Sequence, residues 1–357
     1  MDYKHGGNIY NKNLNSEEII DFSSNINPLG YPNGLKNNLE NAIKKISKYP
    51  DPDYISLRKK LSKKYNVNFK NLIVGNGGIQ LIHNAIEFLE FKKALIIAPT
   101  FVEYEKALVR FNKDFDYFKL KDESDFEFSC EKFLNDKRID KVDLVIICNP
   151  NNPTGNLISK IELKKLLVEL NKKNINLMLD EAFIDFVGED FSLLDLVDKY
   201  NNLIVLRSLT KFYAIPGIRL GFLATSNNNL LKRINKLRES WSVNIFAKYF
   251  GKNLIFDKEY EINSKKYIDK QRKLMFNKFK NMSEIKVFRS YANYLFFKLN
   301  INLDLKEELI KEKILIRSCK NYKGLTDKYY RVAVKTKDEN KKLLNKIKKL
   351  LGVKNNE

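Results

Sequence analysis

The chain has few of the residues that build metal centres and disulfide frameworks. It contains only two histidines, His5 and His83, among 357 residues, so His-rich metal sites and Ser-His-Asp triads are poorly supported and we expect no metal. Its three cysteines, Cys130, Cys148 and Cys319, are odd in number and far apart, which disfavours a disulfide framework. Because Cys148 lies inside an apolar run, we expect it to be buried as a small hydrophobic side chain.

Long apolar segments are also missing. No run approaches the length of a membrane span, and residues 1–8 lack the apolar core of a secretion signal. We therefore expect a soluble, cytoplasmic protein with no membrane partner. The hydrophobic content of 43% and the 24 phenylalanines argue against disorder. A chain of this length fits one large domain and one smaller domain.

The formal charge of +21 raises the possibility of a nucleic-acid partner. However, the lysines are spread along the chain among many asparagines, and the sequence has no Arg-rich block, zinc-finger spacing or RNA-binding aromatic signature. We therefore expect no nucleic-acid partner, and a basic nucleic-acid-binding protein remains as a non-enzymatic alternative.

Strand and helix patterns alternate through the middle of the sequence, which is typical of an α/β protein with helices on both faces of a sheet. Helices are expected at about 79–89 and 159–173. In such a sheet, ligands bind outside the carboxyl ends of the strands, and four of these ends carry Gly, Asn, Asp or Lys. The expected strands cover residues 72–74, 94–97, 144–147, 175–179, 203–206 and 220–224.

The pattern changes after about Trp241 and predicts a smaller α+β domain. Helical stretches cover 244–281, and short strands alternate with one further helix after them. We expect residues 35–250 to form the large cofactor-binding domain and 251–357 the small domain. Residues 1–34 are expected to pack on the small domain and the active site. The later elements are expected at 285–288, 294–299, 305–312, 314–317 and 329–334.

The segment from Ser208 to Gly221 is the most informative part of the chain. It places Lys211 just after the apolar, β-branched run 203–206, where a buried strand should end. A lysine there is poorly placed as a solvated charge but well placed to form a Schiff base with a carbonyl cofactor. Ser208 and Arg219 nearby suit the phosphate of pyridoxal 5′-phosphate.

Each other requirement of pyridoxal phosphate also has a candidate residue. Asp180, at a strand end, can pair with the protonated ring nitrogen, and Asn152 can donate a hydrogen bond to the phenolic O3′. Tyr104 can stack on the ring. Gly78 and Ile79 open a helix whose first amides can hold the phosphate.

These residues follow one another in a characteristic order. Asn152, Asp180, Lys211 and Arg219 are separated by 28, 31 and 8 residues, which together with the motif Asn-Pro-Thr-Gly at 152–155 resembles class I/II aminotransferases. The resemblance implies the pyridoxal-phosphate-dependent transferase fold of type I, with a mostly parallel central sheet in the large domain, and a homodimer. Phe183 departs from the pattern, since many relatives have a tyrosine there that donates to O3′.

Within that family the chain resembles two branches that act on phosphorylated substrates. His5-Gly-Gly-Asn8, the stretch 21–30, the stretch 180–186 and Trp241-Ser-Val-Asn244 are similar to the threonine-phosphate decarboxylases of cobalamin biosynthesis. This implies decarboxylation of O-phospho-L-threonine to (R)-1-aminopropan-2-ol phosphate and CO₂. The other branch, histidinol-phosphate aminotransferase, is the alternative.

The resemblance also assigns roles to single residues. Lys211 and Asp180 would be catalytic, Arg331 would hold the α-carboxylate, and Arg317 would lie near the anionic end of the substrate. Decarboxylation and transamination use the same visible residues, so spacing leaves the reaction open, and the choice between phosphothreonine and phosphoserine is open as well. The implied substrate contacts are His5, Gly6, Asn25, Asn152, Arg317 and Arg331.

Overall fold

The computed structural model describes residues 5–10, 18–253 and 256–352. Seven strands form the largest sheet, in the order β2-β8-β7-β6-β5-β3-β4. Neighbouring strands are parallel, except that β8 is antiparallel to both β2 and β7. The strands are β2 Leu72–Asn76, β3 Lys93–Ala98, β4 Asp114–Lys119, β5 Leu144–Cys148, β6 Asn176–Asp180, β7 Leu203–Ser208 and β8 Leu220–Thr225.

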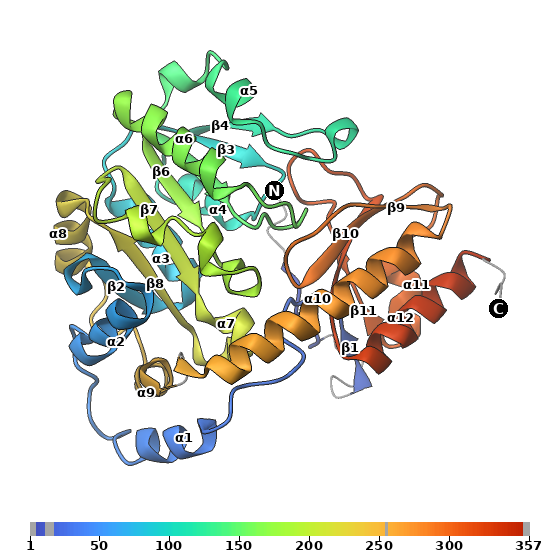
Figure 1. Ribbon diagram of the computed structural model, residues 1–357, viewed down its shortest axis with the longest axis horizontal. Helices are drawn as coiled ribbons and strands as arrows, with labels where there is room; N and C mark the ends of the chain where they lie inside the picture. The colour runs from blue at the N-terminus through green and yellow to red at the C-terminus, as the bar shows by residue number, and fades with distance from the viewer. Residues whose placement is uncertain (1–4, 11–17, 254–255, 353–357) are drawn as a thin grey trace.

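Helices cover both faces of this sheet (Figure 1). In β5, Leu144 and Ile146 belong to one apolar cluster, and Val145 and Ile147 belong to the other. Alternate side chains of a buried parallel strand therefore pack on opposite helical layers, and the expectation of a doubly covered sheet is confirmed. One layer contains α3 Gly77–Phe88, α4 Glu103–Arg110 and α8 Asn228–Leu237, and the other contains α2 Ile55–Tyr65, α5 Cys130–Leu134 and α6 Lys160–Lys172.

Local sequence explains where these helices begin. Ser159 precedes α6, and its hydroxyl accepts a hydrogen bond from the amide of Glu162 at 3.2 Å, which satisfies one of the free amides of the first turn. Leu163, Leu166 and Leu170 then recur at helical spacing and are fully buried. Strand β4 was not predicted, because it is an edge strand whose residues are only half-buried or exposed and show no apolar run.

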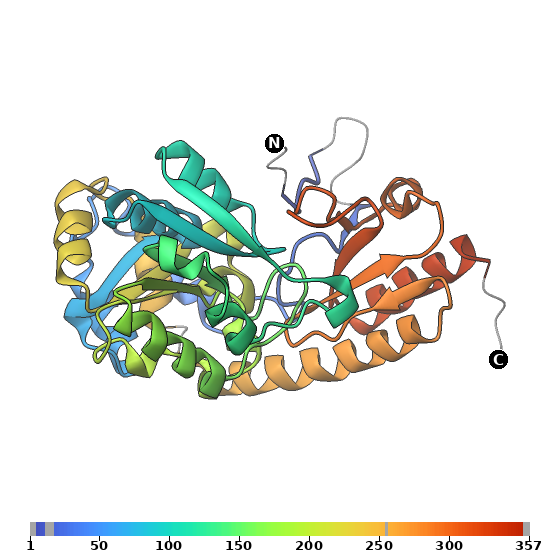
Figure 2. The ribbon, with the colours of Figure 1, turned by 90° about the horizontal axis from the view of Figure 1, so that it is seen from above.

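A second, antiparallel sheet forms the smaller part of the molecule, in the order β12-β13-β10-β9. Figures 1 and 2 show the long helix α10 (Lys258–Lys280) running from the large sheet to this smaller one. Leu179 of the large sheet and Leu295 of the small sheet belong to one apolar cluster, so the two parts share a continuous core. The remaining elements here are β9 Ile285–Val287, β10 Tyr294–Leu299, α11 Leu305–Lys311, β12 Arg317–Ser318, β13 Tyr329–Ala333 and α12 Lys337–Leu350.

The N-terminal part of the chain connects a separate two-stranded sheet to the turn that carries Lys211. Strand β1 (Ile20–Asp21) pairs in parallel with β11 (Ile314–Leu315). A few residues later, the amide of Asn27 donates to the carbonyl of Lys211 at 3.0 Å. The domain boundaries expected at 34/35 and 250/251 remain predictions, and residues 1–4, 11–17, 254–255 and 353–357 of these units lie outside the described residues. The other helices are α1 Leu35–Ile43, α7 Leu209–Phe212 and α9 Ile245–Asn253.

The three cysteines are free and buried, Cys148 at the end of β5. Within the described ranges, no helix has the length and apolar character that crossing a lipid bilayer would require.

Candidate active site

The carboxyl ends of β5, β6 and β7 lie side by side and open onto one cavity of about 240 Å³. The strand register pairs Cys148 with Asp180 and Asp180 with Leu206, so residues distant in sequence meet at one edge of the sheet. Twelve of the thirteen predicted site residues line this cavity: His5, Gly6, Asn25, Gly78, Ile79, Asn152, Asp180, Ser208, Lys211, Arg219, Arg317 and Arg331.

Lys211 lies in the short helix α7, directly after β7. Its Nζ donates a hydrogen bond to the Ser208 hydroxyl at 2.8 Å, and that hydroxyl is 2.9 Å from the Thr210 hydroxyl. The amine also lies 5.6 Å from the centre of the Phe183 ring. Burial lowers the pKa of Lys211 from its usual value, which increases the neutral, nucleophilic fraction of the amine.

Asp180 is a buried carboxylate whose oxygens are held by two donors. Its Oδ2 accepts a hydrogen bond from the Tyr104 hydroxyl at 2.6 Å, and its Oδ1 accepts one from the amide of Ala182 at 2.9 Å. Burial raises the pKa of Asp180 despite these bonds and the charge of Lys211. A cation placed beside Asp180 in the cavity would counteract that effect and favour the ionised form.

The structure corrects the stacking role predicted for Tyr104. This side chain is fully buried behind Asp180 and does not line the cavity. Phe101, one turn earlier, lines the cavity instead and meets Tyr104 edge-on with ring centres 5.9 Å apart. Both aromatic residues lie near the start of α4, and the path of the chain into the helix decides which ring faces the cavity.

The start of α3 has the features of an anion site. Its cap residue, Asn76, makes no side-chain hydrogen bond to the helix, and the first turn has no acidic residue, so the first amides remain available to an anion. Gly77 has a φ of +76°, and a Cβ built there would lie 2.4 Å from Nη2 of Arg219. The positive φ favours glycine at position 77, where a side chain would also have to displace the Arg219 guanidinium. Gly77 is not among the residues predicted for the phosphate, which are Gly78 and Ile79.

Asn152 is oriented by an arginine from the small sheet. Arg331 donates through Nη1 to Asn152 Oδ1 at 2.5 Å and through Nη2 to the carbonyl of Ser23 at 2.6 Å. Because a guanidinium only donates, Oδ1 of Asn152 must be the acceptor. The side-chain amide nitrogen of Asn152 therefore lies on the other side of the amide group, where it can donate a hydrogen bond. Tyr322 lines the same wall, with its hydroxyl 3.3 Å from the same oxygen.

Arg317 and Arg331 are directly opposite each other on the antiparallel strands β12 and β13. Both are largely buried, with exposed fractions of 9% and 5%. Like charges at facing positions of a sheet repel each other, and an anion between them would relieve that repulsion. Arg317 also donates to Asn321 Oδ1 at 2.8 Å and lies over the ring of Tyr322.

The N-terminal segment forms another wall of the cavity. A Cβ on Gly6 would come within 2.2 Å of the carbonyl oxygen of Ser23, so only glycine permits this close approach. Asn25 is buried, and its Oδ1 has no hydrogen-bond partner among the described residues. The Nε2 of His5 lies 2.6 Å from Oε1 of Glu103, a contact that the sequence interpretation did not include because 98 residues separate the two positions.

A buried charged network around Arg207, a residue that is also part of the cavity lining, joins β7 to the segment that follows β6. The fully buried Arg207 contacts Glu181 Oε2 at 2.8 Å, Asp185 Oδ1 at 3.0 Å and Glu189 Oε2 at 2.7 Å. Burial raises the pKa of Asp185 to about 6 even beside this guanidinium. The two acids at the end of β6 therefore have different surroundings. Asp180 opens onto the cavity, and Glu181 is held in the network.

The cavity residues fit pyridoxal 5′-phosphate. The amine of Lys211, the carboxylate of Asp180 and the oriented amide of Asn152 match its aldehyde, ring nitrogen and O3′. The uncapped start of α3 with Ser208 and Arg219 matches its phosphate. The orphaned Oδ1 of Asn25 and Nε of Arg331 leave further polar groups for a substrate.

Comparison with known proteins agrees with this geometry. The profile for aminotransferase class I and II matches residues 17–347, nearly the whole chain. The chain belongs to this family. Family members use pyridoxal 5′-phosphate, so the protein is a pyridoxal-phosphate-dependent enzyme with the fold of type I.

Relatives within the family come from both branches. The threonine-phosphate decarboxylase of Salmonella typhimurium strain LT2 is 33% identical, covering 97% of this chain and 96% of its own length. The histidinol-phosphate aminotransferase of Methanococcus aeolicus is 30% identical, covering 96% and 92%. A crystal structure of histidinol-phosphate aminotransferase from Clostridium acetobutylicum is 34% identical with a TM-score of 0.87, covering 93% of this chain and 98% of that one. These similarities establish the family and do not separate the two activities.

Proposed function

We propose that the protein decarboxylates O-phospho-L-threonine to 1-aminopropan-2-ol phosphate, a step of cobalamin biosynthesis. The observation that carries the proposal is the cross-strand pair Arg317–Arg331, which faces the same cavity as His5 and Lys211. A substrate with both a carboxylate and a phosphate needs two cationic sites, and this wall supplies them. Histidinol phosphate has a phosphate but no carboxylate and would use only one of them, while the carboxylate of the keto acid that an aminotransferase also binds would use the other.

The residues of this chain divide the work by position. Arg331 binds the α-carboxylate, since its guanidinium is fixed by Asn152 and Ser23. Arg317 and His5 bind the phosphate, and the buried Asn25 contacts the substrate between them. Phe101, which lines the cavity, would cover one face of the cofactor ring. Pyridoxal phosphate supplies an electron sink for the bond that breaks.

Decarboxylation requires a proton at the carbon that loses CO₂. The C–C bond to the carboxylate breaks, its electron pair stays on Cα, and a C–H bond then forms there. Lys211 is the proposed proton donor, because its Nζ lies in the cavity with Ser208 as a hydrogen-bond partner and burial lowers its pKa toward the working range. Asp180, held by Tyr104, would pair with the protonated ring nitrogen of the cofactor, whose positive charge would keep the carboxylate ionised.

The cofactor assignment predicts a spectroscopic result. Purified protein should show the visible absorbance of pyridoxal phosphate bound covalently to a lysine, and Lys211→Ala should lose it, because among the described residues no other lysine lines the cavity. An unchanged spectrum in Lys211→Ala would refute the assignment. Lys323→Ala, at a lysine that is not in the cavity lining, is the control.

The reaction is tested with both substrates. Incubation with O-phospho-L-threonine should release CO₂ without any keto acid. Turnover of histidinol phosphate that depends on a keto acid, with no CO₂ from phosphothreonine, would instead identify the aminotransferase. That second candidate is supported by the 34% identity and TM-score of 0.87 to the Clostridium acetobutylicum enzyme. A methyl group separates phosphothreonine from phosphoserine, so both should be assayed.

We also propose a homodimer. Tyr49 and Trp241 stack on each other with ring centres 4.5 Å apart although both are exposed, and Ile43 and Ile46 are exposed nearby in sequence. Such a group of apolar side chains suits burial against a second copy. Sedimentation equilibrium should give the dimer mass.

The non-enzymatic alternative predicts DNA binding that weakens steeply with salt, which a titration at two salt concentrations tests.

A further inference from the structure

The two histidines of the chain contact the same buried carboxylate. Glu103, the first residue of α4, has an exposed fraction of 1%. Its Oε1 lies 2.6 Å from Nε2 of His5 and 3.1 Å from Nζ of Lys106, and its Oε2 lies 3.3 Å from Nε2 of His83. Burial alone would raise the pKa of Glu103, but the hydrogen bonds from His5, His83 and Lys106 hold it well below its usual range. The group is therefore a buried anion with specific partners.

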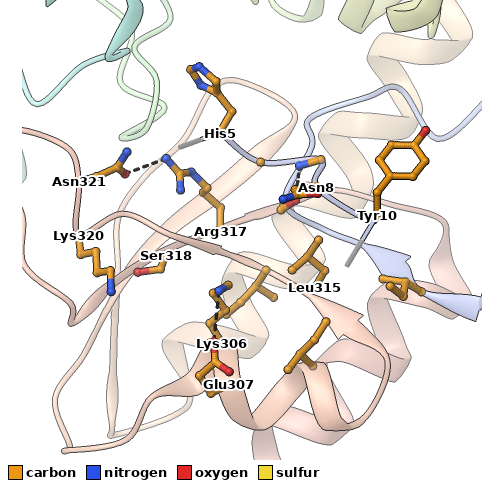
Figure 3. A pocket seen from close by; sticks show the side chains of 16 residues that line it. His5, Asn8, Tyr10, Lys306, Glu307, Leu315, Arg317, Ser318, Lys320 and Asn321 are labelled. Carbon is orange, nitrogen blue, oxygen red and sulfur yellow. Dashed lines mark hydrogen bonds and ion pairs between the residues drawn. The ribbon is translucent and has the colours of Figure 1, made fainter. Parts of the chain in front are cut away.

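His5 belongs to the N-terminal strap, defined here as residues 5–10. The strap lies between the 240 Å³ cavity of Lys211 and a larger outer cavity of about 700 Å³, and His5 and Gly6 line both. Figure 3 looks into the outer cavity and shows His5 at the same end as the side chain of Arg317. The strap therefore separates the substrate cavity from the outer one.

The strap is held from two sides. On the side of the small sheet, the amide of Gly7 donates to the Ser23 hydroxyl at 2.7 Å. On the side of the large sheet, His5 meets Glu103, and its ring lies 5.6 Å from that of Phe101. Glu103 thus supplies the strap with a charged contact on the body that carries Lys211.

We propose that Glu103 is a positioning residue that closes the N-terminal strap over the substrate cavity and fixes the His5 ring for the substrate's phosphate. The identity of the substrate in this inference rests on the proposed function. The closure of the strap does not depend on it. A carboxylate that holds one ring nitrogen of a histidine fixes the ring plane and leaves the other nitrogen to a ligand. With Nε2 engaged by Glu103, Nδ1 is the nitrogen that remains for the phosphate.

Glu103→Gln is the first test, because it keeps the shape of the side chain and removes its charge. Hydrogen–deuterium exchange should rise at least about tenfold at the strap amides. The KM for O-phospho-L-threonine should rise about tenfold or more while kcat changes little, as expected for the loss of a hydrogen bond to a charged group. Glu105→Gln is the matched control, since Glu105 is a buried carboxylate on the same helix that accepts from Tyr117 and does not line the cavity.

The path through His5 is tested by a double-mutant cycle. His5→Ala should reproduce the effect on KM, and the double variant His5→Ala/Glu103→Gln should be no worse than either single variant. His83→Ala should have a smaller effect, since His83 lines neither cavity. Additive effects of His5 and Glu103 would overturn the inference. Because His5 is partly exposed, His5→Ala keeps the test valid even if Glu103→Gln folds poorly.

Failure of this inference can be told apart from failure of the proposed function. If wild-type protein releases no CO₂ from phosphothreonine, the proposed function fails, and KM is then measured with histidinol phosphate, which also carries a phosphate. The exchange of the strap amides needs no substrate at all. Unchanged exchange in Glu103→Gln, or raised exchange with an unchanged KM for the phosphorylated substrate, would overturn the inference in either case.

Discussion

Tyr104→Phe separates two roles that the same side chain could have. If Tyr104 stacked on the cofactor ring, phenylalanine would replace it without loss. In the structure, its hydroxyl donates the shorter of the two hydrogen bonds to the Asp180 carboxylate, at 2.6 Å against 2.9 Å for the amide of Ala182. We therefore expect the variant to bind pyridoxal phosphate more weakly than the wild type.

The size of the effect follows from the kind of bond that is lost. A hydrogen bond to a charged group contributes about 1.5–3 kcal/mol, which corresponds to a rise of about 10- to 150-fold in the dissociation constant. Loss of the Tyr104 donor also removes an interaction that lowers the pKa of Asp180. The ionised fraction of Asp180 should therefore fall further in the variant, and the defect should grow as the pH decreases.

The assay is a titration of the cofactor-free protein with pyridoxal phosphate, followed by absorbance, at several pH values. Tyr117→Phe is the control, because it removes a similar tyrosine–carboxylate bond, to Glu105, at a place away from the cavity. Phe101→Leu should weaken binding by loss of an aromatic face, without the pH dependence. Wild-type affinity in Tyr104→Phe would refute the assigned role.

Three further predictions test other parts of the site. Gly77→Ala should lower the free energy of unfolding by about 1–2 kcal/mol, because φ is +76° and the new Cβ meets Arg219; denaturant unfolding checks this, with Gly78→Ala as a milder control. Between about pH 4 and 6, native Asp185 keeps a proton that the unfolded chain has lost, because its pKa is raised to about 6. The free energy of unfolding of the wild type should therefore fall relative to that of Asp185→Asn as the pH rises through that range. A difference between the two free energies that stays constant with pH would contradict this prediction. Arg331→Lys should lower kcat/KM for phosphothreonine at least about tenfold while leaving the visible absorbance in place.

The sequence predicted those parts of the site that depend on the ends of buried strands. Lys211, Asp180 and Asn152 follow apolar runs, and parallel pairing brings such ends together whatever the loops do. Six of the seven strands of the large sheet, and strands β9, β10 and β13 of the smaller one, were predicted for the same reason, because they have clear apolar patterns. The antiparallel pairing of the smaller sheet was not predicted. Edge strand β4, with its charged residues, gave no such signal.

Other features depend on which way a side chain points and on contacts between distant residues, and the sequence pattern specifies neither. Phe101 and Tyr104 are both aromatic and three residues apart, and only the path of the chain into α4 decides which one reaches the cavity. Glu103 looks like a surface residue at a helix start, where acidic side chains are common. It is buried and contacts His5, and nothing local predicts a contact across 98 residues.

The opposite surroundings of Asp180 and Glu181 also bear on how this enzyme could be altered. Asp180 is a buried acid whose ionisation is opposed by its environment, so its replacement by asparagine should raise the stability of the cofactor-free protein while abolishing its chemistry. Burial raises the pKa of Glu181 as well, but Glu181 is paired with the buried Arg207, so its loss removes a partner of that guanidinium and should reduce the yield of folded protein. Two acids joined by one peptide bond would thus give opposite signals in a mutational survey. Selection for solubility alone would favour the replacement of Asp180 and the retention of Glu181. Engineering of this scaffold therefore needs an activity screen alongside any stability screen.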